Sequence, residues 1–399
     1  MKAIHLSAGN LYGGIETLLA TLARLRHLAP EVEPEFGFCF RGRAWDELSA
    51  TDVPVHDLGP VRLGRPWTVW RARARLRGVL GRGRHGAVVI HGPWAHAVFA
   101  PEVRRAGIPL VLFAHGESNR SHWLDRKAAQ SPPDLVVANS RFTARSAEAL
   151  MPGTRVEAWH LPVARPPEDA GARPGVRSEF GTADGTAVIL QASRLESWKG
   201  QAVLLEALGR LRDVPGWECW LAGGVQKPGE SEFLAELRSI AGRAGIADRV
   251  RFLGDRGDVR RLMAAADVYC QPNLGPEPFG IAIVEALHAG LPVVTSGAGG
   301  AAEIVDEACG ILTPPGDAAA VSGALRALIE DAPRRGRLGG SGPHRAERLC
   351  DPARQLGSSA ATLLRLAGRG ARGGNPIGGA GHSPREPQLT PGIAWESSS

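Results

Sequence analysis

Two glutamates, Glu277 and Glu285, flank a turn rich in Pro and Gly that follows an apolar run. The run Val268–Gln271 is typical of a buried strand, and a helix is expected to begin near Gly280. Free N–H groups in the first turn of that helix would bind phosphate oxygens, because the helix dipole favours negative charge there. Glu285, one to two turns further, could accept hydrogen bonds from two vicinal ribose hydroxyls. Glu277 would reach a sugar beyond the phosphates.

Two cations, Arg194 and Lys199, occupy another loop that follows an apolar run, residues 187–191. Arginine offers a planar fork of donors and lysine a compact point charge, so together they match the oxygens of a diphosphate. Taken alone, the pair fits a solvated basic loop equally well.

Two series of strand-like and helical segments must position these residues. The first covers residues 2–161 and the second residues 187–330, and both repeat the order strand, loop, helix. This order indicates parallel strands with crossover helices. The strands are continuous apolar runs, as expected when helices cover both faces of a sheet. The fold class predicted is α/β, with two doubly wound parallel-sheet domains whose ligands bind beyond the carboxyl ends of the strands, in a cleft.

Composition suggests the domain limits. Residues 162–185 combine prolines, glycines and charges without an apolar period, which is typical of an interdomain linker. We therefore expect an N-terminal domain over 1–161 and a C-terminal domain over 186–350. One more helix is expected over 351–366. The tail 367–399 has too little apolar content to order itself and is predicted to be disordered.

The overall composition is globular: 43% of the 399 residues are hydrophobic and 22% are charged, enough to build two ordinary cores. No apolar run reaches the roughly 18 residues of a membrane span. The first residues enter a strand-like segment without a signal-type sequence, so a cytoplasmic location is expected. The five cysteines are isolated and contain no CxxC pair, which predicts buried free thiols rather than disulfides or a zinc site.

One stretch is strongly basic. Between Arg62 and Arg84 lie eight arginines and no acid, interleaved with Trp67 and Trp70. Helical spacing places apolar residues on one face of this stretch: Val69, Ala72, Leu76, Val79 and Leu80. Two interpretations remain open, a solvated basic helix face or a surface that meets anionic lipid headgroups on the inner face of a membrane or an acidic acceptor. Nucleic acid is not favoured, because no recognition motif is present.

The stretch from Glu277 to Glu285 resembles the E-x7-E motif of the retaining glycosyltransferases with the GT-B fold, family 4, also called glycosyl transferases group 1. Four other segments are similar to elements of that family. They are Gly13-Gly14-Ile15-Glu16, Asn139-Ser140 with Thr143, Arg194 through Lys199-Gly200, and the loop from Gly297 to Glu303. In the third, Ala192-Ser193 replaces the usual small-Gly pair. The resemblance covers residues 2–330 and concerns the donor class rather than the acceptor.

The resemblance implies a role for each matching residue. Arg194 and Lys199 would hold the diphosphate, Glu285 the ribose, and Glu277 the hydroxyls of the donor sugar. The remaining donor-binding positions implied are Gly13, Gly14, Pro278, Phe279, Gly280 and Ile281.

Further positions are assigned to the N-terminal domain. The family places a histidine at the rim of the cleft, and His115, after the run 110–114, matches it as a catalytic candidate. The alternative is a structural histidine at a strand end. Weaker acceptor-side candidates are Glu16, His91, Glu117 and Asn139.

The chemistry implied is transfer of a hexosyl group from a nucleotide-diphospho-sugar with retained configuration and without a metal or other cofactor. The acceptor stays open: a sugar, a glycolipid of bacterial glycan or glycoconjugate biosynthesis, or a small molecule. Alternatives are another enzyme of the same fold, such as an epimerase or phosphorylase, and a non-catalytic nucleotide-sugar-binding partner. A nicotinamide-dependent dehydrogenase is excluded, because no G-x-G-x-x-G follows the first strand of either half.

Overall fold

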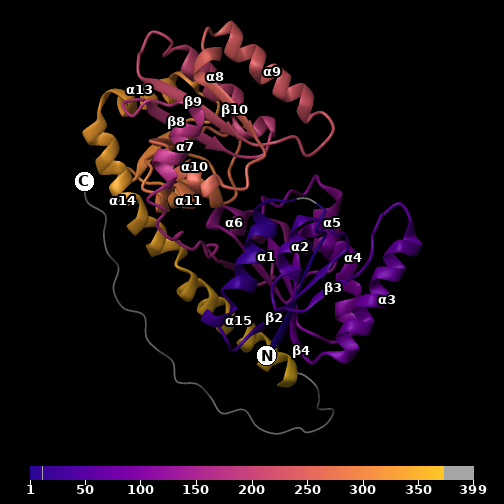
Figure 1. Cartoon of the computed structure of the whole chain (residues 1–399). Coiled ribbons are helices and arrows are strands. Elements are labelled where there is room, and N and C mark those ends of the chain that lie inside the picture. Colours follow the sequence, from indigo (N-terminus) through magenta and orange to yellow (C-terminus); the bar gives the residue numbers. More distant parts are fainter. Residues whose placement is uncertain (11, 373–399) are drawn as a thin grey trace, which may run out of the picture.

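The computed structural model describes residues 1–10 and 12–372 and contains two parallel sheets, each in its own α/β domain (Figure 1). The first sheet has seven strands in the order β3-β2-β1-β4-β5-β6-β7, and the second has six in the order β10-β9-β8-β11-β12-β13. Strand order reverses direction beside β1 in one sheet and beside β8 in the other. The doubly wound α/β architecture predicted from the sequence is thereby confirmed.

The N-terminal domain alternates strands with helices along the chain. Its strands are β1 (Lys2–Ser7), β2 (Glu33–Phe38), β3 (Val55–Asp57), β4 (His85–His91), β5 (Leu110–Ala114), β6 (Leu135–Ala138) and β7 (Val156–Ala158). Its helices are α1 (Gly14–Arg24), the short 3-10 helix η1 (Arg26–Leu28), α2 (Arg43–Ser49), α3 (Pro66–Arg82), α4 (Gly92–Arg105), α5 (Trp123–Ala129) and α6 (Arg141–Leu150).

The C-terminal domain repeats the pattern. Its strands are β8 (Ala187–Ala192), β9 (Trp217–Ala222), β10 (Val250–Gly254), β11 (Val268–Gln271), β12 (Val293–Ser296) and β13 (Gly310–Thr313). Its helices are α7 (Ala172–Phe180), α8 (Gln201–Gly209), α9 (Glu230–Arg243), α10 (Val259–Ala265), α11 (Ile281–His288), α12 (Ala301–Ile304), α13 (Ala318–Glu330) and α14 (Ala332–Cys350), with 3-10 turns η2 (Ser197–Lys199) and η3 (Ala247–Arg249).

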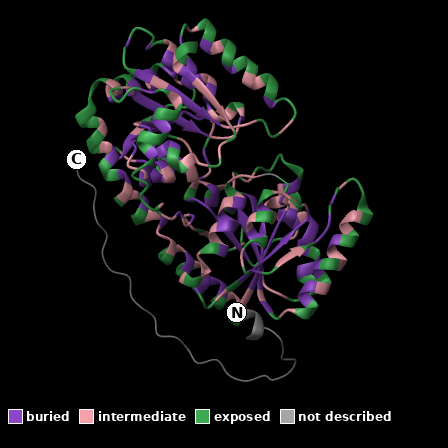
Figure 2. Cartoon of the chain, viewed as in Figure 1, coloured by how far each residue is buried: buried purple, intermediate pink, exposed green. Residues whose placement is uncertain are grey.

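Burial follows the expected layering. Figure 2 shows the strands buried and the outer faces of the helices exposed. Every residue of β5, β6, β8 and β11 is buried, as their continuous apolar runs predict. All five cysteines are buried and unpaired, as predicted. Over the described residues, no helix combines the length and apolar character needed to cross a bilayer.

The segment 162–185 contains α7, a helix that its composition did not predict. Besides Ala172 and Val176, the helix buries a charge: the guanidinium of Arg177 is almost completely enclosed. It donates hydrogen bonds to the carbonyls of Ala265 and Thr186 and pairs with Asp267. Because the arginine is satisfied by the backbone of the neighbouring strand and helix, the burial carries no unpaired charge.

Two long helices at the C-terminal end also differ from expectation. Within α14, Gly339 crosses α11 so closely that a Cβ there would lie 2.1 Å from the carbonyl oxygen of Gly290. The many glycines that argue against a helix therefore allow this close packing. The last helix, α15 (Pro352–Arg372), runs along the N-terminal domain and continues past residue 366 into the segment predicted to be disordered (Figure 1). The rest of that predicted tail, 373–399, lies outside the described residues.

Candidate active site

The carboxylate of Glu277 lies at the centre of a polar cluster after β11. Its Oε2 atom accepts hydrogen bonds from Lys199 Nζ at 2.6 Å, Gln271 Nε2 at 2.9 Å and Asn273 Nδ2 at 2.9 Å. Glu277 is buried, and a buried carboxylate is stable only when it is paired in this way. Within the described part of the chain, no protein group bonds the other oxygen, Oε1. That oxygen is available to accept a hydrogen bond from a hydroxyl group of a ligand.

Two of these partners, Gln271 and Asn273, were missed in the sequence. Their signal is a pair of polar residues, two positions apart, at the end of the apolar strand β11, because such residues share one face. The hydroxyl of Tyr269 donates to Gln271 Oε1 at 2.8 Å. This contact orients the Gln271 amide so that its Nε2 faces Glu277.

The loop 272–280, called the donor loop below, is braced by the loop that follows β12. Glu277 forms a parallel bridge with Gly299, and the amide of Gly300 donates to the Glu277 carbonyl at 2.6 Å. Gly299 has a φ of +77°, and a Cβ there would lie 2.4 Å from the same carbonyl oxygen. Only glycine fits such an approach without strain. The segment 297–303, which resembles a loop of the family, thus lies against Glu277.

Lys199 is aimed at Glu277 by the turn that precedes α8. Gly200 has a φ of +78°, and a Cβ there would lie 1.9 Å from the carbonyl oxygen of Pro272 in the donor loop. The side chain of Gln191 holds the Lys199 carbonyl at 2.8 Å. The ammonium group lies 4.0 Å from the ring centre of Trp198, a favourable cation–π distance.

Arg194 takes a different direction from Lys199. Its guanidinium pairs with Glu196 at 2.8 Å, and its Nε lies 3.9 Å from where a Cβ of Gly13 would be. Arg194 therefore reaches from the C-terminal domain to the beginning of α1, whereas Lys199 points to Glu277 of the donor loop.

In the first turn of α1, two groups that the sequence assigned to ligands bond each other. The Gly13 amide donates to Glu16 Oε2 at 3.1 Å, so this N–H is not free for a phosphate in this structure. Glu16 is buried, which raises the pKa of its carboxyl, and it caps its own helix rather than facing an acceptor. Across the domain interface, Ile281 Cδ1 lies 3.6 Å from where a Cβ of Gly14 would be. The two halves of the expected site are thus in contact here.

The helix α11 begins as the sequence predicted. Gly280, its N-cap, has a φ of +95°, and its carbonyl accepts the first helical bonds from Ile283 and Val284. The N–H groups of the first two helical residues, Ile281 and Ala282, have no partner within the helix and are left for a ligand, as at any helix N-terminus. The Phe279 ring is buried, so only its backbone can approach a phosphate. Pro278 lies next to the N-terminal domain, with its Cγ 3.9 Å from where a Cβ of Gly116 would be.

Glu285 lies in the second turn of α11, where the spacing predicted it. Its Oε1 is 3.6 Å from Arg260 Nε on α10, and 18% of its side chain is exposed. Burial raises the pKa of this carboxyl, and the charge of Arg260 partly offsets the effect.

The candidate site residues of the N-terminal domain differ in how far they are buried. His115 is half-buried directly after β5, and Glu117 is exposed in the same loop. Asn139 is buried and donates to the carbonyl of His115 at 3.0 Å, so it positions that loop instead of meeting an acceptor. His91 is also buried, hydrogen-bonded to His115 on one side and to His5 on the other. His91 and Asn139 are thus enclosed within the domain, their acceptor-side role stays a prediction, and His5 was not among the predicted residues.

A contact between the domains lies beside these groups. The Glu303 carboxylate, on α12, accepts hydrogen bonds from the amides of Arg141 at 3.1 Å and Phe142 at 2.8 Å, at the start of α6. His160 Nε2 lies 3.3 Å away. Burial alone would raise the pKa of Glu303, but these hydrogen bonds lower it overall. A charged Glu303 thus joins the C-terminal domain to the helix dipole of α6.

Comparison with known proteins identifies the family. Residues 173–345 match the family model "Glycosyl transferases group 1", and residues 12–164 match "Glycosyltransferase Family 4". The chain is 32% identical over 273 residues to a GDP-mannose-dependent alpha-(1-6)-phosphatidylinositol monomannoside mannosyltransferase of Mycolicibacterium smegmatis, of which it covers 68%. The chain belongs to glycosyltransferase family 4.

Other known proteins match this chain over shorter or longer spans. A phosphatidyl-myo-inositol mannosyltransferase of Mycobacterium leprae is 39% identical over 151 residues, which are 37% of this chain and 38% of that protein. The matched region thus spans well under half of that relative's length. Among solved structures, Anabaena HepE in complex with UDP and glucose has a TM-score of 0.80 and 26% identity, over 92% of this chain and 99% of that one.

Metal ligands are not clustered in this family 4 chain as far as it is described. Over residues 1–10 and 12–372, no three His, Cys, Asp or Glu side chains gather as a metal site would need. The positive charges beside the donor loop come from Lys199 and Arg194.

Acid should destabilise the folded protein through histidines whose pKa is lowered in the folded state. Burial lowers the pKa of His5 to about 4 and that of His115 to about 3, below the usual 6.5. The unfolded chain therefore binds more protons as the pH falls below about 6.5, and each such histidine costs about 1.4 kcal/mol of stability per pH unit. We expect the unfolding temperature to fall between pH 7 and pH 5. The fall should be smaller in His5→Gln, measured by thermal unfolding, and unchanged in His27→Gln, which removes an exposed histidine. Equal slopes for His5→Gln and wild type would contradict the assignment.

Proposed function

We propose that this family 4 protein transfers a hexosyl group from a nucleotide-diphospho-sugar to an acceptor hydroxyl, with retention of anomeric configuration and without a metal ion. In this reaction the bond between the anomeric carbon and the phosphate oxygen breaks, and a bond to the acceptor oxygen forms. The acceptor proton leaves with the nucleotide diphosphate. The observation that carries the proposal is the buried Lys199–Glu277 pair, with one free carboxylate oxygen, beside the N-terminus of α11.

The charges at this site suit the departing diphosphate. Negative charge grows on the leaving phosphate as the bond breaks, and Lys199, Arg194 and the start of α11 supply positive potential that is already in place. Glu277 Oε1 would accept a hydrogen bond from a hydroxyl of the sugar. The ion pair between Lys199 and Glu277 would then hold the phosphate and the sugar in register.

Two routes would retain configuration, a double displacement and front-face attack, and the groups around Glu277 favour the second. A double displacement needs a carboxylate nucleophile and a second carboxyl roughly 5 Å away. The groups that bond Glu277 are a lysine and two amides, with no second carboxyl among these contacts. In front-face attack the acceptor approaches on the same side as the leaving group. This mechanism needs neither a carboxylate nucleophile nor a second carboxyl.

Relatives guide the choice of substrates. One relative is named as GDP-mannose-dependent, and HepE was solved with UDP and glucose. Several are named for phosphatidylinositol or D-inositol 3-phosphate. We therefore propose an acceptor with a polyol headgroup, either as a phosphate or as a lipid.

The first experiment is a thermal-shift screen of GDP-mannose, UDP-glucose and ADP-glucose. A donor at 100 times its Kd should add about 2.7 kcal/mol of apparent stability. The donor that binds is then incubated with D-inositol 3-phosphate or phosphatidylinositol, with and without EDTA, and the product anomer is read by proton NMR. We expect an α-linked product from an α-linked donor at the same rate with EDTA. A β-linked product, or loss of transfer with EDTA, would contradict retention or metal independence. Epimerised donor, or binding without transfer to either acceptor, would favour the alternative functions.

We also propose that α3 rests on the anionic, cytoplasmic face of a membrane. The apolar face predicted for this helix is buried at Ala72, Leu76, Val79 and Leu80, yet Trp67 and Trp70 are 58% and 68% exposed. Three of the eight arginines are engaged within the protein: Arg75 and Arg77 form ion pairs, and Arg73 bonds backbone carbonyls. The other five have no side-chain partner within residues 1–10 and 12–372 and would be available to lipid phosphates. Tryptophans beside arginines are the side chains that suit a membrane interface.

Vesicle flotation tests this surface. The protein should float with vesicles that contain anionic lipid and stay behind with neutral ones, and salt should weaken the binding, since each arginine contributes about 1 kcal/mol that is screened. The double variant Trp67→Ser, Trp70→Ser should lose flotation. Trp123→Ser removes an equally exposed tryptophan from α5 and serves as the matched control. Flotation that survives in the double variant would exclude α3 as the contact.

A further inference from the structure

Three histidines step diagonally across one face of the N-terminal sheet. His5 lies on β1, His91 ends β4, and His115 follows β5. In the register of the parallel strands, His5 pairs with Val89 and His91 pairs with Phe113. His91 therefore lies two residues after the neighbour of His5, and His115 lies two residues after the neighbour of His91. Residues two apart in a strand point to the same face of the sheet. The row runs from the middle of the sheet to the edge where the strands end.

The three rings are joined end to end. His5 Nδ1 lies 3.0 Å from His91 Nε2, and His91 Nδ1 lies 2.8 Å from His115 Nε2. Phe113 stacks on His115 with ring centres 4.4 Å apart and on His91 at 5.4 Å. His5 and His91 are buried, so the chain is shielded from water along most of its length.

Three histidines joined in this way have only two possible arrangements of their protons. Burial lowers the pKa of all three rings, so each is neutral and carries one N–H at neutral pH. Each hydrogen bond needs one donor and one acceptor, and His91 must donate through one nitrogen and accept through the other. All three rings therefore point their protons the same way, either from His5 toward His115 or in reverse.

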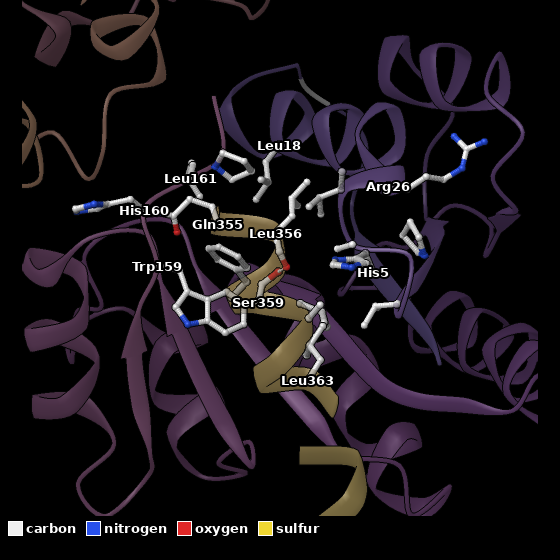
Figure 3. A pocket seen from close by; sticks show the side chains of 18 residues that line it. His5, Leu18, Arg26, Trp159, His160, Leu161, Gln355, Leu356, Ser359 and Leu363 are labelled. Carbon is white, nitrogen blue, oxygen red and sulfur yellow. Dashed lines mark hydrogen bonds between the residues drawn. The ribbon is translucent and has the colours of Figure 1, made fainter. Parts of the chain in front are cut away.

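The surroundings of His5, at one end of the row of histidines, decide which way the protons point. His5 lines a cavity of about 70 Å³ between the sheet, α1 and α15, and Figure 3 shows it pointing toward α15. The cavity walls are mostly apolar: Leu18, Leu22, Val89, Leu356 and Leu363. Within the described residues, no protein group hydrogen-bonds His5 Nε2. Unpaired buried N–H groups are rarer in proteins than unpaired acceptors, so His5 is expected to carry its proton on Nδ1 and to donate it to His91.

We propose that His5 and His91 are positioning residues that hold His115 as the Nδ1–H tautomer, so that His115 donates a hydrogen bond to an oxygen of the transferred sugar. This inference rests on the proposed function. Among the residues that the structure describes, His115 Nε2 bonds His91 and no protein group bonds His115 Nδ1. The next residue, Gly116, faces Pro278 of the donor loop, since a Cβ on Gly116 would lie 3.9 Å from Pro278 Cγ, and this places the His115 end of the row on the donor side. A fixed donor at this place selects sugars that present an oxygen acceptor to it.

Nitrogen NMR of ¹⁵N-histidine-labelled protein reads the tautomer directly. The signals of His115 are assigned from the spectrum of His115→Gln. We expect wild-type His115 to carry its proton on Nδ1, and His5→Phe to convert it to a mixture of tautomers because the far end of the chain is lost. A wild-type His115 protonated on Nε2, or an unchanged spectrum in His5→Phe, would overturn the proposal.

Kinetics supply the second reading. His91→Phe keeps the ring volume and removes both hydrogen bonds, so kcat should fall by roughly 10- to 100-fold, as when the partner that orients a ligating histidine is lost. The KM for the nucleotide-sugar should change little, because the diphosphate contacts remain. His96→Phe replaces a buried histidine of α4 that does not belong to the row of three, and it controls for effects on packing. An equal fall in kcat for both variants would reduce His91 to a structural role. The NMR reading needs no turnover, so a protein that transfers no sugar would refute the proposed function without touching the tautomer.

Discussion

Replacing Lys199 with alanine is expected to lower kcat for sugar transfer by roughly 10²- to 10³-fold, the usual effect of removing one group that stabilises charge in a transition state. The ammonium group is 2.6 Å from Glu277 Oε2 and only 14% of the lysine side chain is exposed. Its charge therefore acts in a site of low polarity, where electrostatic effects are larger than in water. Steady-state kinetics with the preferred donor measure the effect.

Stability must be separated from catalysis in this variant. Lys199→Ala leaves the buried Glu277 carboxylate without its cation, and breaking a buried pair costs about 3–5 kcal/mol. The double variant Lys199→Ala, Glu277→Gln removes both charges and should regain most of the stability in thermal unfolding while staying inactive. Lys127→Ala, an exposed lysine of α5, is the matched control and should keep full activity. A double variant that is stable and active would refute the role of the pair.

Replacing Glu285 with alanine is expected to lower kcat/KM by roughly 10²- to 10⁴-fold, because two hydrogen bonds from ribose hydroxyls to a carboxylate are each worth about 1.5–3 kcal/mol. The loss should appear mainly as weaker donor binding. The protein should stay folded: the only ion-pair partner of Glu285, among the described residues, is the half-exposed Arg260, and such a pair contributes at most about 1 kcal/mol.

A donor without the ribose 2′-hydroxyl tests the contact itself. Wild type should bind the 2′-deoxy form of its donor more weakly than the natural one, whereas Glu285→Ala should bind the two nearly alike. Glu330→Ala, an exposed glutamate of α13, should retain the wild-type preference. If Glu285→Ala still discriminates between the two donors, the carboxylate does not hold the ribose, and the donor-site assignment must be revised.

Much of the C-terminal domain could be predicted because its signals are local. The strand β11 was predicted with its observed bounds, and α11 begins at Ile281 as the turn before it indicated. Apolar runs, Gly280 at a positive φ and the spacing from Glu277 to Glu285 depend on few neighbours. The helices α7 and α14 were missed because their stability comes from contacts far along the chain. Arg177 binds the carbonyl of Ala265, and Gly339 packs on the backbone of Gly290.

The same division holds for the site. Residue types and spacing determined by themselves that Glu277, Glu285, Arg194 and Lys199 follow buried strands, and hence that they lie at the edge of a parallel sheet. Only the tertiary structure decided which of them touch. Lys199 meets Glu277, Arg194 turns toward α1, and His91 is buried between two other histidines. Hydrogen bonds between side chains on different strands depend on strand order and register, and these are set by packing over the whole domain rather than by any local pattern.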